Sequence, residues 1–231
     1  MKKTLLLIKL FFIGISAVYS QSDIQFKDSF NLDSCTFAST GKNTYFILEP
    51  GYQLTYKGKE DGEEITLIIT VLNETKIVSG IETRIVEERE SSDGELYEVS
   101  RNYFAVCKET NDIYYFGEDV DEYEDGKITG HSGTWKAEGK NKPGLIMPGN
   151  PSAGLKYYQE IAPGIAMDRA EILSVSETIV TLAGKFGNVL KTEETSSLEP
   201  KDKSFKFYAP DVGLIRDGDL PLVKYGFVDF K

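Results

Sequence analysis

The sequence predicts an all-β protein: an antiparallel curved sheet, barrel or sandwich built from two repeated β-meanders, with little helix. Apolar and polar residues alternate with a period of two, as where Phe205 and Phe207 are separated by Lys206. Glycine-containing turn pairs separate these runs, at 61–62, 79–80, 93–94, 125–126, 183–184 and 217–218. Asp-Gly pairs supply the positive φ angles that hairpin turns require. No long segment has the 3.6-residue period of a helix, so antiparallel strands are expected throughout.

Residues 1–20 are predicted to be a secretory signal peptide. Two lysines follow Met1, the run Leu5–Val18 is apolar except for Lys9, and Val18 and Ser20 are small enough for a cleavage site. The run is too short to span a membrane, so we expect no transmembrane segment in the mature chain. The expected product is a single domain, residues 21–231, secreted to the periplasm or outside the cell.

The charge balance argues against nucleic-acid binding. The chain has a formal net charge of −11 and one histidine. Removing the signal peptide takes away three lysines and no acid, so the mature charge becomes −14. Binding to phosphate backbones needs a basic face. A single histidine also excludes zinc sites built from several histidines.

The chain has two cysteines, Cys35 and Cys107. In an oxidising compartment they can pair and tie the N-terminal segment to the body of the fold. Two separate buried thiols are the alternative.

An internal repeat organises the chain. Residues 71–75 match 174–178 at an offset of 103, and later positions match at 104, which defines repeat units of about 52–118 and 155–219. Residues 166–173 also suit two helical turns. On the repeat alignment, however, 166–176 corresponds to the strand-like run 63–73. We therefore predict a strand there.

Between the repeats, residues 119–154 are predicted to form a loop-rich insertion. The segment begins acidic, ends rich in proline and glycine, and contains the only His and the only Trp of the chain, His131 and Trp135. Long loops between regular elements frequently carry function.

The residues of this region suggest two alternative metal sites. Asp119, Asp121 and Asp125 provide the hard oxygen ligands that calcium prefers, although their spacing is not that of an EF-hand. The alternative is a charged, solvated edge strand that ends in an Asp-Gly turn.

A copper site is the second metal hypothesis. His131, Met147 and Met167 combine imidazole and thioether ligands, a set suited to Cu(I). Two packed methionines and a surface histidine are the alternative. Apart from calcium or copper, no cofactor is expected.

Aromatic residues are abundant, with 12 Tyr and 11 Phe outside the signal peptide. Adjacent aromatics on a strand point to opposite faces, so one of each pair can line a concavity. We predict a groove bordered by Tyr115, Trp135 and Tyr158 that takes a small hydrophobic or glycan ligand. Cross-strand packing explains the same residues without a ligand.

Catalytic motifs are absent from the sequence. A Ser-His or Cys-His system would have to use His131, and no Gly-x-Ser-x-Gly elbow occurs. A pair of catalytic carboxylates is defined in space and not by spacing. The leading hypothesis is therefore a non-enzymatic binding or envelope-associated protein. A metal-binding protein and a hydrolase are the alternatives.

Several short motifs give the chain a family likeness. They are Tyr114–Val120, Asp125–Lys127, Trp135, Lys142–Gly144, Tyr157–Glu160 and Tyr208–Ile215. With these motifs the chain resembles, from about Tyr45 to Tyr225, a widespread group of secreted bacterial β-rich proteins of unknown function. The resemblance implies secretion and provides no catalytic or binding residue. In architecture alone, the chain is also similar to periplasmic curved-sheet carriers of the lipoprotein-localisation type.

Overall fold

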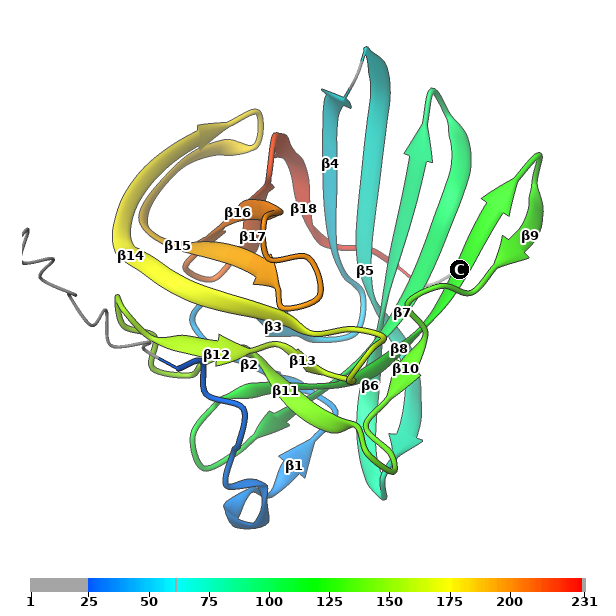
Figure 1. The fold of residues 1–231 in the computed structure, drawn as a ribbon. Helices are drawn as coiled ribbons and strands as arrows, with labels where there is room; N and C mark the ends of the chain where they lie inside the picture. Colours follow the sequence, from blue (N-terminus) through cyan, green and yellow to red (C-terminus); the bar gives the residue numbers. More distant parts are fainter. Residues whose placement is uncertain (1–24, 61, 230–231) are drawn as a thin grey trace, which may run out of the picture.

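The structure, a computed structural model, describes residues 25–60 and 62–229, so the predicted signal peptide lies outside the described residues. Within these ranges the chain forms strands, one 3-10 turn and no α-helix (Figure 1). The elements are η1 Leu32–Ser34, β1 Phe37–Ala38, β2 Gly41–Lys42, β3 Ile47–Leu48, β4 Tyr52–Glu60, β5 Glu63–Val78, β6 Ile81–Ser92, β7 Glu95–Cys107, β8 Ile113–Glu124, β9 Lys127–Gly130, β10 Trp135–Lys136, β11 Lys142–Met147, β12 Lys156–Tyr158, β13 Glu160–Ile161, β14 Asp168–Thr181, β15 Gly184–Ser196, β16 Lys203–Ala209, β17 Gly213–Asp217 and β18 Leu220–Phe227. The predicted all-β class is confirmed, and 166–176 belongs mostly to β14. In the described part of the chain, no helix is long and apolar enough to cross a membrane.

One antiparallel sheet curves into a nearly closed barrel. Its strand order is β12-β14-β15-β16-β17-β18-β4-β5-β6-β7-β8-β11-β13, with β1 added to β7 and with β9 and β10 added to β8. Two consecutive meanders, β4–β8 and β14–β18, form most of the wall (Figure 1). Their origin by duplication stays a prediction.

Two segments join the meanders by changing partners along their length. The first residues of β18 pair with β17, whereas Leu222–Phe227 pair with β4. At the other joint, β12 pairs with β14, and the backbone amide of Gln159 donates to the carbonyl of Asp168 at 2.8 Å. The next residues form β13 and pair with β11. The segment 156–161 therefore bridges the two ends of the sheet.

Strand β4 illustrates why these sequences form a barrel wall. Tyr52, Leu54 and Tyr56 alternate with polar residues and are at most 7% exposed, because they point to the barrel interior, here called the lumen. The Tyr52 hydroxyl donates to the carbonyl of Val212 at 2.8 Å, and the Tyr56 hydroxyl donates to that of Leu214 at 2.7 Å. These bonds link β4 to the neighbourhood of β17 through the interior.

Of the six predicted turn pairs, three have positive φ angles at both residues, whereas at 183–184 and 217–218 only the glycine does, and Asp61 lies outside the described residues. In the pairs Ser79-Gly80, Asp93-Gly94 and Asp125-Gly126, both residues have positive φ angles of 49–87°. That combination is typical of the tight turns that match the twist of antiparallel strands.

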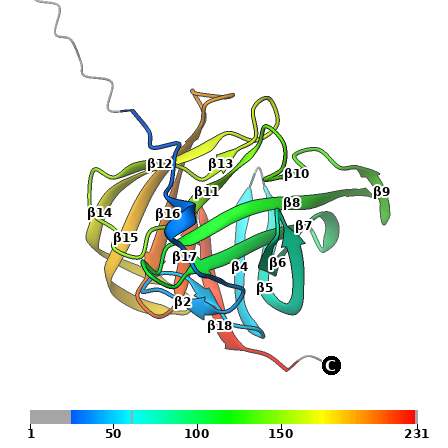
Figure 2. The same ribbon diagram turned by 90° about the horizontal axis from the view of Figure 1, so that it is seen from below.

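The N-terminal segment crosses the lower end of the barrel, as the view from below shows (Figure 2). Strand β1 pairs with the end of β7, and Cys35 forms a disulfide with Cys107, whose Cα atoms are 5.0 Å apart. Of the two alternatives that the sequence left open, the structure has the paired cysteines.

The segment 119–154 differs from the predicted insertion. Its first residues complete β8, and β9, β10 and β11 follow. Charge and turn residues dominate the acidic run, and this composition predicts the start of a loop. Pairing with β7 extends the strand through it, from Arg101–Asp119 to Glu98–Glu122.

Candidate functional site

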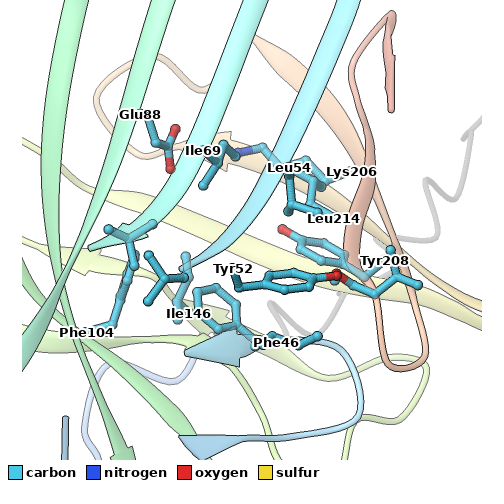
Figure 3. Close-up of a pocket in the computed structure, with 15 residues that line it drawn as sticks. Phe46, Tyr52, Leu54, Ile69, Glu88, Phe104, Ile146, Lys206, Tyr208 and Leu214 are labelled. Atoms are coloured by element: carbon cyan, nitrogen blue, oxygen red, sulfur yellow. The ribbon is translucent and has the colours of Figure 1, made fainter. Parts of the chain in front are cut away.

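An apolar cavity of about 90 Å³ occupies the part of the lumen nearest the N-terminal segment. Its lining residues are Phe46, Ile47, Tyr52, Leu54, Ile69, Val71, Val86, Glu88, Phe104, Ile146, Lys206, Tyr208, Val212, Gly213 and Leu214. Glu88 and Lys206 are the only charged residues among them. Figure 3 shows these two at one end of the cavity and the rings of Phe46 and Phe104 at the other.

The composition of the lumen changes along the strands. On β6, the inward positions pass from Val86 to Glu88 and Glu90, because alternate residues of a strand share a face. On β7, the same direction leads from Phe104 through Asn102 to Glu98. The lumen is therefore apolar next to the N-terminal segment and becomes acidic away from it.

The opposite wall has the same gradient. On β15, Leu190 is followed on the same face by Thr192 and Glu194, and on β16 Tyr208 is followed by Lys206. A second hollow of about 420 Å³, here called the acidic pocket, adjoins the apolar cavity at Lys206. It is lined by Asp168, Glu194, Thr195, Ser196, Glu199, Asp202, Lys203, Ser204, Lys206 and Asp217.

Lys206 is held between two carboxylates. Its Nζ lies 3.3 Å from Glu194 and 3.5 Å from Asp217. Burial disfavours the charged form of Lys206, but Asp217 and Glu194 outweigh it and raise the pKa of Lys206 well above its usual value. The lysine is therefore protonated and neutralised by residues of its own wall.

Glu88 has a different environment. It lies deep in the barrel, where protein surrounds it, and part of its side chain borders the cavity. Burial raises the pKa of Glu88 to about 8, although Lys206 acts in the opposite direction. The other charged groups that act on it are Glu90, Asp217 and Glu118, and all three raise its pKa further. At neutral pH this carboxyl is largely protonated.

Two further acidic residues, Glu118 on β8 and Glu160 on β13, lie near β10. Burial raises the pKa of Glu118 to about 7, and burial together with Glu118 raises the pKa of Glu160 well above its usual value. Trp135 is paired directly opposite Glu118, and its indole is 3% exposed.

Gly117 makes this arrangement possible. Its φ is +126°, and a Cβ atom there would lie 2.3 Å from the carbonyl oxygen of Trp135. The register shift at this point lets Tyr115 and Glu118 both face inward, although they are three residues apart.

The predicted aromatic groove is only partly assembled. The rings of Tyr115 and Trp135 are in edge contact, with centroids 5.3 Å apart, and both are buried. Tyr158 lies elsewhere: its neighbour Tyr157 takes the inward position with 0% exposure, so Tyr158 points outward and contacts Phe26. The three residues do not border one groove.

Two of the predicted calcium ligands, Asp119 and Asp121, point to the outside of β8 and have protein partners. Asp119 accepts hydrogen bonds from Lys136 Nζ at 2.6 Å and from the Tyr103 hydroxyl at 2.5 Å. Asp121 accepts one from Arg101 at 2.9 Å. Asp125 is exposed in the hairpin turn. The acidic run thus forms a strand that ends in the Asp-Gly turn, but β8 pairs with β7 on one side and with β9, β10 and β11 on the other, so it is not the edge strand of the alternative.

The predicted copper ligands are dispersed. His131 is exposed and lies 3.1 Å from Asp121, whereas the buried Met147 pairs with Ile113 at the opposite end of β8. Asp121 and Ile113 are eight positions apart on the strand, roughly 26 Å at about 3.3 Å per residue. Met167 precedes β14 and bonds through its backbone carbonyl to Ser197. The structure thus brings no two of these ligands together.

Sequence reasoning missed Glu88, Lys206 and the apolar lining of the cavity. A usable signal was present: on β6 and β7 the residues of one face change from apolar to acidic along the strand. Acidic residues at alternate positions usually indicate a solvent face, and this hid the interior site.

The sequence matches no known protein family, and neither a characterised protein nor a solved structure shows significant similarity to it.

Proposed function

We propose that this protein is a secreted, non-enzymatic binding protein that holds a small amphipathic molecule in its lumen. The apolar cavity carries this proposal, because Glu88 and Lys206 are the only charged groups among its lining residues. Well-formed apolar hollows with a few convergent polar groups are typical of small-molecule sites.

The size of the cavity limits the ligand. Its volume of about 90 Å³ exceeds the ~10–15 Å³ that one water needs and is below the ~150 Å³ of an apolar cavity that holds benzene. It therefore suits a short chain or, with small side-chain adjustments, a single ring. The rest of the ligand would extend past Glu88 and Lys206 into the acidic pocket.

Of the two ligand classes expected from the sequence, the hydrophobic one is favoured over a glycan. Sugar hydroxyls need hydrogen-bonding partners when they are buried. The apolar lining offers few of them, since the Tyr52 hydroxyl already donates to Val212. The disulfide between Cys35 and Cys107 supports an oxidising compartment, in agreement with the predicted secretion.

Cavity filling tests this function. Titration of the purified protein with 2-phenylethanol, followed by calorimetry, should detect binding. Val86→Phe places a ring in the cavity and should abolish it. Val180→Phe makes the same change at a side chain that is 73% exposed and should leave binding intact. If Val86→Phe folds, as judged by circular dichroism, and binds like the wild type, the lumen is not the site.

A hydrolase is the second candidate, because Glu118 and Glu160 lie deep in the barrel beside Trp135. Glycoside hydrolysis needs one protonated carboxyl and one ionised carboxylate, with pKa values that differ. Neither Glu118 nor Glu160 is among the lining residues of the apolar cavity or the acidic pocket, which favours binding over catalysis. Hydrolysis of nitrophenyl glycosides that is lost in Glu160→Gln would reverse this order.

A further inference from the structure

The acidic pocket has an excess of negative charge next to the apolar cavity. Five carboxylates and two lysines are among its lining residues. One of these lysines, Lys206, is already paired with Glu194 and Asp217. An anionic ligand group would have to compete with these partners, whereas a cationic group would find unsatisfied charge.

Glu88 lies at the boundary between the two compartments. No basic nitrogen of the described residues comes within 4.0 Å of its carboxylate, and no hydrogen bond to it is present among them. Ionising Glu88 without a partner is costly in a buried position. Lys206 lowers this cost only in part, since it is itself paired with Glu194 and Asp217, and a cation brought by the ligand would add to its effect.

A buried hydroxyl provides an independent observation. Tyr157 is 0% exposed, and its hydroxyl has no hydrogen-bonding partner among the described residues. It interacts electrostatically with Glu194, which lines the acidic pocket, and with Tyr208, which lines the apolar cavity. Buried polar atoms in native proteins almost always have a partner, so the unpaired Tyr157 hydroxyl indicates a missing polar group or water near Glu194, although Tyr157 itself is not among the lining residues of either hollow.

The spacing of the carboxylates argues against a metal ion. Within the described ranges, only Cys35, Cys107 and Glu109 place three ligand atoms within 4.8 Å of one another, and the two sulfurs form the disulfide. The carboxylates of the lumen are thus too dispersed to coordinate one metal ion, which needs several oxygens at about 2–2.6 Å. An organic cation is larger and spreads its charge over several such groups.

We propose that the ligand is a protonated amine, with a small apolar group in the apolar cavity and its ammonium beside Glu88 and the acidic pocket. This inference rests on the proposed function and names the chemical class of its ligand. A hydrogen bond between charged partners should raise the affinity about tenfold or more.

Three probes of equal shape and different charge test the inference. Wild-type protein is titrated at pH 8.5 with 2-phenylethylamine, 2-phenylethanol and phenylacetate. Calorimetry measures the affinity, and the fluorescence of Trp135, the only tryptophan of the chain, reports on the lumen. The amine should bind about tenfold more tightly than the alcohol, and phenylacetate should bind most weakly.

A matched pair of variants locates the charge. Glu88→Gln should lower the affinity for the amine about tenfold and leave that for the alcohol unchanged. Glu87→Gln, at the next residue on the outer face, should change neither. Since the comparison of probes needs only the wild type, the test holds even if Glu88→Gln fails to fold.

Each outcome decides between the two proposals. Equal affinity for the amine and the alcohol overturns the amine inference and leaves the binding function standing. An amine preference that persists unchanged in folded Glu88→Gln also overturns it, because Glu88 is then not the counter-charge. If none of the three probes binds, the proposed function fails together with the inference.

Discussion

Replacing Glu88 by glutamine should stabilise the protein at alkaline pH and leave its stability unchanged near pH 4.5. Burial raises the pKa of Glu88 from 4.5 to about 8, so between these values the folded protein holds a proton that the unfolded chain has lost. Stability that depends on this group is therefore fully present below pH 4.5 and falls as pH rises to about 8. Glutamine has no proton to lose and removes this dependence.

The magnitude follows from the size of the shift. Each pKa unit corresponds to about 1.4 kcal/mol, so the full shift would give about 5 kcal/mol above pH 8. Because the side chain borders the cavity and water can relax around it, we expect roughly 2–4 kcal/mol. This is a large fraction of the stability of a typical domain.

Urea unfolding of the wild type and of Glu88→Gln at pH 5, 7 and 9 measures the effect. The pKa of Glu118 is also raised, but the difference between the two proteins isolates Glu88. Glu87→Gln, on the outer face, should show no comparable pH-dependent gain. A wild type that is as stable as Glu88→Gln at pH 9, or more stable, would refute the reasoning. It would mean that Lys206 stabilises the ionised carboxylate.

Two further predictions concern the framework around the site. Cys107→Ser should lower the free energy of unfolding by about 4 kcal/mol, because the disulfide closes a loop with a sequence separation of 72 residues. Addition of reductant should lower the free energy of unfolding of the wild type by the same amount and leave that of Cys107→Ser unchanged. Gly117→Ala should destabilise the protein by about 1–3 kcal/mol and shift the fluorescence of Trp135, because the alanine Cβ would collide with the backbone of Trp135. Gly187→Ala is the control: a Cβ at Gly187 has no atom within 4 Å, so neither effect is expected.

The hairpins were predictable because their chemistry is local. Asp93-Gly94 and Asp125-Gly126 have the positive φ angles that an Asp-Gly turn adopts, whatever the rest of the fold does. The strand at 168–181 was also predictable, although its first residues suit a helix, because the repeat alignment placed them on a strand.

The site was less predictable from the sequence, and the wrong placement of Tyr158 in the aromatic groove has the same cause. A period of two states which residues share a face and leaves open which face is inside. Tyr157 and Tyr158 are equivalent in the sequence, and pairing of β12 with β14 decides that Tyr157 is buried. If the wrong face of a strand is assigned to the interior, every side chain of that strand is placed on the wrong side of the sheet.

The sequence by itself therefore determined the β class, the turn positions and the alternation along each strand, since all three depend on neighbours within a few residues. The tertiary structure decided that Glu88 lies in the lumen of a nearly closed barrel, above an apolar cavity. That outcome depends on long-range pairings, β18 with β4 and the segment 156–161 with β14 and β11. This closure shields Glu88 from most of the bulk water, and burial then raises the pKa of its carboxyl above that of an exposed carboxylate.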